Sequence, residues 1–105
     1  MVDYAFENTR NDTIAVGTSS VIVSRSRTQE DGQFRKEMII RNTSDDATKI
    51  ITVNFGEQQA TNNAGVVLRQ NELINLNSEL GNKCYQGIIT AICAVAAGQL
   101  SVFER

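Results

Sequence analysis

Histidine is absent from this 105-residue chain, and with it the side chain that most often acts as a general base near neutral pH. A Ser-His-Asp or Cys-His catalytic arrangement therefore cannot be built within the chain. Glycine-rich phosphate loops are missing too, because the seven glycines are dispersed. The adjacent carboxylates of Asp45 and Asp46 lie in a polar turn, where they are normally solvated. We expect a protein that is not an enzyme and has no cofactor and no bound metal.

Long apolar runs are also missing. The richest stretch, Ile88–Ala97, is half of the roughly 20 residues that a membrane helix needs. The first residues lack the positive start and apolar middle of a signal peptide. Ten basic and twelve acidic residues are scattered along the chain and give a net charge of −2. We expect a protein made in the cytoplasm, with neither a membrane nor a nucleic acid as its partner.

Cysteine occurs only twice, at Cys84 and Cys93. If both lie in one extended segment, their backbones are too far apart for a disulfide. We expect two free thiols that serve as small apolar side chains.

Alternation of apolar and polar residues recurs along the chain and predicts short β-strands. Turn-forming segments rich in Gly, Asn and Asp separate them. The pattern predicts a single-domain, all-β protein: an antiparallel β-sandwich, jelly-roll or Ig-like, with about seven to eight strands. We place an extended N-terminal arm at residues 1–19, with at most one short strand, and the sandwich at residues 20–105. The expected strands lie near residues 20–27, 34–41, 48–55, 65–68, 73–76, 85–95 and 100–103.

Asp31-Gly32 is a strong turn signal and predicts a hairpin between the strands near residues 20–27 and 34–41. Such a hairpin would gather five basic side chains on neighbouring strands. Acidic residues in the same hairpin favour an ordinary solvated face over a phosphate-binding surface. The five are Arg25, Arg27, Arg35, Lys36 and Arg41.

The segment 85–95 is the most apolar part of the chain, and apolar residues fall on both faces of the expected strand. It should therefore be a central strand, covered by the core on one side and by another layer or a neighbouring subunit on the other. A helix is the alternative here, but Gly87 and Gly98 bracket a β-branched stretch too short for a typical helix. The run 65–68 is expected to be a buried strand as well.

Several side chains near the chain ends are candidates for contacts with a neighbouring protein. Aromatic residues there can close the ends of the core, or they can anchor a partner with little loss of side-chain entropy. The sequence leaves both readings open. The candidates are Tyr4, Phe6, Phe103 and Arg105.

A series of short segments carries a resemblance to a known group of proteins. They are Met38–Asn42, Ile51–Gly56, Gly65–Leu68, the run from Gln86-Gly87 to Ile92, and Leu100–Arg105. In this order, over about two-thirds of the chain, they resemble small bacteriophage virion proteins of the head-decoration, cement or minor-capsid type. The chain departs from that pattern in its long N-terminal arm and in having no proline after Leu68.

The resemblance implies a non-catalytic virion structural protein that stabilises or decorates a phage capsid through protein–protein contacts. Its expected partners are the major capsid protein or neighbouring minor proteins, and it is expected to form a homo-oligomer. The alternative is an attachment module at the base of a fibre or spike, recognising a receptor or a carbohydrate. Sugar binding is disfavoured, because the chain has no tryptophan and only two tyrosines.

Overall fold

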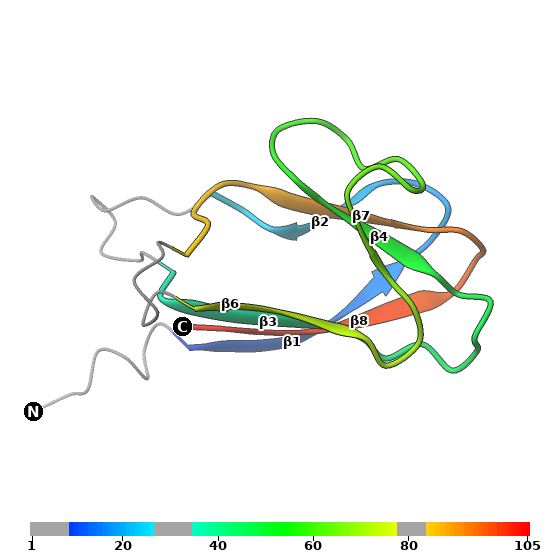
Figure 1. Cartoon of the computed structure of the whole chain (residues 1–105), viewed down its shortest axis with the longest axis horizontal. Helices are drawn as coiled ribbons and strands as arrows, with labels where there is room; N and C mark the ends of the chain where they lie inside the picture. The colour runs from blue at the N-terminus through cyan, green and yellow to red at the C-terminus, as the bar shows by residue number, and fades with distance from the viewer. Residues whose placement is uncertain (1–8, 27–34, 78–83) are drawn as a thin grey trace, which may run out of the picture.

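The computed structural model describes residues 9–26, 35–77 and 84–105. These residues form eight strands in two antiparallel four-stranded sheets that pack as a sandwich (Figure 1). The expected all-β sandwich is confirmed. Sheet A has the order β1 (Arg10–Val16), β8 (Gly98–Glu104), β3 (Glu37–Asn42), β6 (Leu73–Asn77). Sheet B has the order β2 (Val21–Ser24), β7 (Ile89–Cys93), β4 (Ile51–Phe55), β5 (Val66–Leu68).

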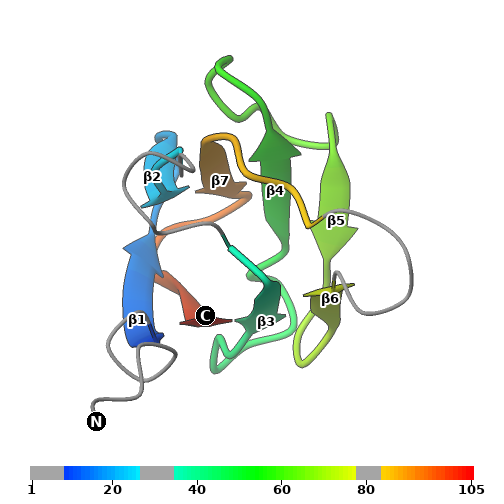
Figure 2. The same ribbon diagram turned by 90° about the vertical axis from the view of Figure 1, so that its left-hand side faces the viewer.

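The connectivity is that of a jelly roll. Strands pair from the outside of the sequence inwards: β1 with β8, β2 with β7, β3 with β6 and β4 with β5, all antiparallel. This is the pattern of one long hairpin that is folded over so that successive pairs lie in alternate sheets. Seen end-on, β1 and β2 lie along one side of the sandwich and β5 and β6 along the other (Figure 2).

The predicted hairpin between the second and third expected strands is wrong. β2 pairs with β7 in sheet B, whereas β3 pairs with β6 and β8 in sheet A. Asp31 and Gly32 lie outside the described residues. A local turn signal does not determine which sheet a strand joins. The apolar–polar alternation of β2 and β3 is compatible with the two strands pairing in one sheet or lying in opposite sheets, because either arrangement buries the apolar side chains.

Residues assigned to an N-terminal arm contribute a full strand to the sandwich. β1 runs beside β8 over its whole length, from Arg10 opposite Glu104 to Val16 opposite Gly98. Ile14 and Val16 pack against the core. The sequence predicted at most one short strand in this arm, near Thr13–Val16. β1 is longer than that, because the charged residues at its start also pair with β8.

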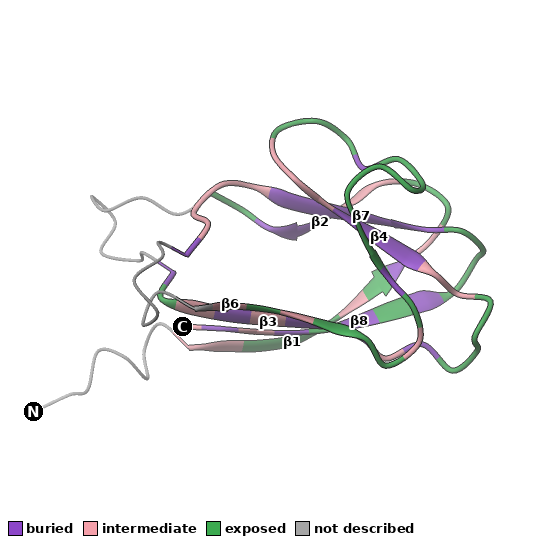
Figure 3. Ribbon diagram, viewed as in Figure 1, coloured by how far each residue is buried: buried purple, intermediate pink, exposed green. Residues whose placement is uncertain are grey.

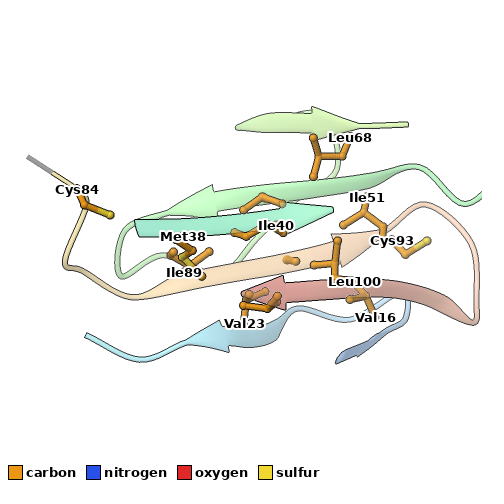
Figure 4. Close-up of a cluster of buried hydrophobic side chains, with 13 residues drawn as sticks. Val16, Val23, Met38, Ile40, Ile51, Leu68, Cys84, Ile89, Cys93 and Leu100 are labelled. Atoms are coloured by element: carbon orange, nitrogen blue, oxygen red, sulfur yellow. The ribbon is translucent and has the colours of Figure 1, made fainter. Parts of the chain in front are cut away.

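Alternation decides which side chains fill the space between the sheets. On β3, Met38 and Ile40 are fully buried, while Ile39 between them is only half-buried. Figure 4 shows inward side chains of both sheets meeting in one cluster. Cys84 and Cys93 are free and buried, as predicted, and desolvation raises the pKa of the Cys84 thiol. The buried cluster comprises Val16, Val23, Met38, Ile40, Ile51, Val53, Leu68, Cys84, Ile89, Ala91, Cys93, Leu100 and Val102.

Buried Asn42 holds the sheets together at the end of β3. Its Nδ2 donates to the carbonyls of Lys49 and Leu68, each at 2.9 Å, and its Oδ1 accepts from Ser44 N at 3.0 Å. Lys49 leads into β4 and Leu68 ends β5, so this one amide joins sheet A to two strands of sheet B. Every polar atom of the side chain has a partner, as burial requires.

β7 is the central strand that was predicted, and all five of its residues are buried. Its outer side is covered by the chain's own β4–β5 loop (residues 56–65). The Gln58 carbonyl accepts from Thr90 Oγ1 of β7, and Asn63 N donates to Thr52 Oγ1 of β4. Figures 1 and 3 show this loop lying across β4 and β7. The second cover of β7 is thus the β4–β5 loop of the same chain.

Glycine is required where the β4–β5 loop enters β5. Gly65 has a φ of +137°, and an added Cβ would lie 2.5 Å from the Val53 carbonyl oxygen. β5 itself is less buried than predicted, because Val66 and Val67 are 41% and 37% exposed and only Leu68 is enclosed. The physical reason is its place at the edge of sheet B, where one side has no neighbouring strand.

Two neighbours on β3 test the packing. Ile40→Ala should lower the free energy of unfolding by about 2–5 kcal/mol, because it leaves a cavity between the sheets. Ile39→Ala, on the outer side of the same strand, should cost about 1 kcal/mol or less. Urea denaturation followed by circular dichroism measures both. Equal losses would contradict the assignment of the two faces.

Candidate protein-interaction surface

The outer face of sheet A carries two of the four interface candidates. Phe103 of β8 lies between Asn11 of β1 and Ile39 of β3 in the cross-strand register. Because side chains alternate, Phe103 points outwards while its neighbours Val102 and Glu104 are buried. Tyr4 and Phe6 lie outside the described residues.

Arg105 is fixed against β3. Its Nε donates to Glu37 Oε1 at 2.8 Å, with the two side chains 38% and 19% exposed. The backbones pair as well, since Arg105 N donates to the Glu37 carbonyl at 3.0 Å and Glu37 N donates to the Arg105 carbonyl at 3.1 Å. Arg105 therefore borders the outer face of sheet A as a charge compensated by Glu37.

The outer face of sheet A is open, in contrast with that of sheet B. Its outward side chains are exposed or half-buried: Asn11, Thr13, Ala15, Ile39, Arg41, Leu73, Asn75, Gln99, Ser101 and Phe103. A shallow depression beside Phe103 is lined by Asn11, Thr13 and Ser101, among others. On the central strands of sheet B, by comparison, the outward Thr52, Thr90 and Ile92 are buried, and the β4–β5 loop bonds to the two threonines.

The chemistry of this face is suited to contact with another molecule. Its polar groups are mainly amides and hydroxyls, which donate and accept hydrogen bonds but are poor nucleophiles without an adjacent base. Among residues 9–26, 35–77 and 84–105, no group of three or more His, Cys, Asp or Glu is placed to hold a metal ion.

In the described part of the chain, no helix is long and apolar enough to cross a membrane.

Directly behind Phe103, a buried ion pair reaches from sheet A towards sheet B. Arg35 Nε donates to Glu104 Oε2 at 2.8 Å, and the two side chains are 1% and 2% exposed. Ser24 of β2 completes the contact between the sheets. Its Oγ lies 3.1 and 3.2 Å from the two Glu104 carboxylate oxygens and accepts from Arg35 Nη2 at 2.8 Å.

The guanidinium of Arg35 uses all five of its N–H donors. Besides Glu104 and Ser24, it donates to the carbonyls of Arg25, Tyr85 and Gly87. Gln86 holds the Arg35 backbone from the other side, accepting from Arg35 N at 2.7 Å and donating to its carbonyl at 2.5 Å. Arg35 therefore joins the approaches to β3 and β7 to the last residues of β2 and β8.

Arg10 of β1 adds a second cation to the same carboxylate. Its Nη1 donates to Glu104 Oε1 at 2.9 Å and to the Val23 carbonyl at 3.1 Å, and its Nη2 donates to Asp12 at 2.9 Å. Burial acts to lower the pKa of Arg10, but the hydrogen bonds to Glu104 and Asp12 outweigh it and raise that pKa. Two cations and two carboxylates balance in charge. We name Arg10, Ser24, Arg35 and Glu104 the Glu104 cluster.

The Glu104 cluster was missed in the sequence. Alternation put Arg35 on a wet face, yet its side chain is almost fully enclosed. Its carboxylate partner lies 69 positions away, and no local pattern encodes that distance. The only available signal was that Arg35 lies two residues before β3 and Glu104 is the last residue of β8, so both stand at the ends of strands with strong apolar alternation.

The five basic residues do not form one patch. Arg35 is buried, Arg41 lies on the outer face of sheet A, and Arg25 follows β2 of sheet B. Lys36 is exposed, and Arg27 lies outside the described residues. The expected gathering depended on the hairpin, which does not form.

Comparison of the chain with protein-family models, with curated proteins and with solved structures found no match.

The turn at Asp45 and Asp46 supplies an acid-sensitive hydrogen bond. Asp46 Oδ1 accepts from Thr48 N at 2.7 Å and from Thr48 Oγ1 at 2.8 Å, and these bonds lower the pKa of the Asp46 carboxyl below its usual 3.8. Because the folded-state pKa is depressed, the contribution to stability is present above pH 3.8 and is lost as the pH falls through the folded value.

Carboxyl NMR titration should therefore give Asp46 a midpoint below 3.8. In Thr48→Val, which keeps the backbone donor and removes the hydroxyl, the midpoint should move part of the way back. A wild-type midpoint at or above 3.8 would contradict the turn geometry.

Glu104→Gln tests the buried cluster. The substitution keeps the size of the side chain but leaves the Arg35 guanidinium buried without its carboxylate, so it should lower the free energy of unfolding by about 3–5 kcal/mol. Glu37→Gln is the matched control, because it breaks a half-exposed ion pair with Arg105 and should cost about 1 kcal/mol or less. Denaturant unfolding compares them, and similar small losses in both would show that the cluster contributes little.

Proposed function

We propose that the protein is a non-catalytic structural component of a bacteriophage virion, and that it docks on the capsid through the outer face of sheet A. The jelly roll is an architecture of viral capsid proteins, but also of lectin domains and cupins. The fold therefore supports this role by analogy, and the support specific to this role comes from the surface of the protein. The resemblance of the short strand segments to phage decoration proteins points the same way.

The observation that carries the proposal is the difference between the two outer faces. The chain's own β4–β5 loop bonds to Thr52 and Thr90 on the central strands of sheet B, whereas no described segment covers the outward side chains of sheet A. Only the edge strands of sheet B stay exposed among the described residues, at Ile22 and Val67.

On the outer face of sheet A, Ile39 and Phe103 are half-buried neighbours, and Leu73, opposite Arg41 on the edge strand β6, is 51% exposed. Apolar groups ringed by amides and hydroxyls are typical of the centre of a protein interface.

The charge of the face suits a broad protein partner. Glu37 and Arg105 compensate each other, which leaves Arg41 as the one uncompensated charge among its described positions. A nucleic acid would need a stronger positive field. A capsid surface of mixed polar and apolar groups can be bound without such a positive field.

The size of the face favours binding within an assembly. Four strands about 4.8 Å apart, of seven (β1 and β8), six (β3) and five (β6) residues at about 3.4 Å per residue, cover on the order of 400 Å². That is about half of the roughly 800 Å² that each partner contributes to a standard stable interface. A contact of this size becomes durable when several copies bind one shell together, since linked sites gain avidity. Homo-oligomerisation on the particle fits the same requirement.

The Glu104 cluster would favour binding by holding the contact residues in place. Glu104 and Phe103 are neighbours on β8, one anchored inwards and the other presented outwards. A side chain on a rigid strand loses less entropy on docking than one on a loose segment.

Capsid binding by paired variants tests the proposal. Ile39→Thr/Phe103→Thr keeps strand propensity and should weaken binding to purified capsid shells by about tenfold or more. Val66→Thr/Val67→Thr changes two exposed apolar residues of sheet B and should bind as the wild type does. Sedimentation with shells and native mass spectrometry give the affinity and the stoichiometry.

A wild-type protein that stays monomeric and binds no virion component would contradict the virion role. Binding to receptor glycans or to a fibre, with no binding to shells, would establish the attachment alternative instead.

A further inference from the structure

A second surface, on the side of the sandwich where β1 and β2 lie, has a different chemistry. A shallow hollow there is lined by Arg10, Ile22, Val23 and Arg25. Figure 2 shows the two strands stacked at that side, one from each sheet. Two arginines and an isoleucine that is 44% exposed thus face one depression in a chain whose net charge is −2.

The two arginines differ in how they are held. Arg10 is oriented by Glu104, Asp12 and the Val23 carbonyl, which together use three of its five N–H donors. Arg25 has its backbone carbonyl bound by Arg35, but its exposed side chain makes no ion pair with any described residue. Among the described residues, the Arg10 guanidinium is therefore held in place and the Arg25 guanidinium has no ion-pair partner.

Among the described residues, the charges around the hollow sum to a net positive value. Glu104 and Asp12 balance Arg10 and Arg35, so the charge of Arg25 is left over. Guanidinium groups bind carboxylates and phosphates through paired, charge-assisted hydrogen bonds. Exposed Ile22 beside them adds an apolar contact that a bare inorganic ion would not use.

The edge of β2 limits how a partner can approach. Arg10 occupies the Val23 carbonyl, and the register of β2 shifts between Ile22 and Ser24. A neighbouring strand cannot pair regularly with such an edge, because bulges and blocked carbonyls interrupt the ladder. A side-chain carboxylate reaching into the hollow meets no such obstacle.

We propose that the hollow between β1 and β2 binds a carboxylate carried by an extended peptide segment, with Arg25 as its main contact, Arg10 as a fixed second donor and Ile22 against the neighbouring apolar side chain. The anion site stands on its own residues. Its use by an acidic segment of a neighbouring virion protein rests on the proposed function.

The test is an NMR titration of the ¹⁵N-labelled protein with an acetylated, amidated peptide Ala-Val-Glu-Val-Ala. Shifts should be confined to the described residues of β1 and β2 and to the Arg25 side chain. Arg25→Gln should weaken binding about tenfold, as expected for the loss of a charge-assisted hydrogen bond. Arg41→Gln removes an exposed arginine from the outer face of sheet A and should leave the affinity unchanged.

Two further ligands test whether the hollow binds a peptide carboxylate, the peptide without its charge or a free inorganic anion. The peptide with Gln in place of Glu should bind at least tenfold more weakly, and inorganic phosphate should bind more weakly than the Glu peptide. Equal binding of the Gln peptide, phosphate binding as tight as that of the Glu peptide, or equal effects of Arg25→Gln and Arg41→Gln would each overturn the proposal. Because the titration uses no capsid, its result is independent of the shell-binding experiment.

Discussion

The ion pair of Arg35 and Glu104 is the contact on which one end of the sandwich depends. Removing two charges from water is expensive, and their attraction offsets that cost only when the remaining hydrogen-bonding groups are also satisfied. Here every N–H of Arg35 is used and both carboxylate oxygens of Glu104 are bound. The partners come from β1, β2, β8 and the segment before β7, so the same few atoms hold both sheets and the last strand in one arrangement. Asn42 does the equivalent at the end of β3, through an uncharged amide.

This interior constraint reaches the surface through strand alternation. With Glu104 fixed inwards, the pleat of β8 turns Phe103 outwards, and the register places it beside Ile39. A slip of one residue would exchange the two, burying an aromatic ring among arginines and exposing the carboxylate. The charged cluster therefore specifies the register of the outer face of sheet A as well as closing the sandwich. A proposed docking face gains from this, because its side chains are held by contacts that lie behind it.

Local patterns in the sequence were sufficient for the fold class and for most strands, since alternation records which side of each strand is buried. They were insufficient wherever the answer depended on residues far apart. The turn signal at Asp31-Gly32 does not indicate that β2 and β3 join different sheets. The apolar run at Val66 and Val67 does not indicate that β5 is an edge strand. Nothing in the sequence around Arg35 indicates that its carboxylate partner lies 69 positions away. Of the interface candidates, Phe103 could be placed on an outer face by alternation alone. The arginine hollow could not be found in this way, because Arg10 and Arg25 meet only through the stacking of two sheets.

The surfaces of the described sandwich are finished in different ways, and the difference bears on how such a domain could be oriented in an assembly. The β4–β5 loop covers the centre of sheet B and depends on Gly65 to approach β4 closely, while Ile22 and Val67 on the edge strands stay exposed. Sheet A is open and nearly neutral, and the side formed by β1 and β2 carries an arginine that no described residue compensates, beside an apolar residue. A domain that exposed apolar patches on all sides would aggregate. This domain has one face of mixed apolar and polar groups and one small positive hollow on a different side, and few partners fit both surfaces at once. If the broad face meets a shell and the hollow meets an acidic segment of a neighbour, each contact fixes a different direction, and together they define the orientation that neither could define alone.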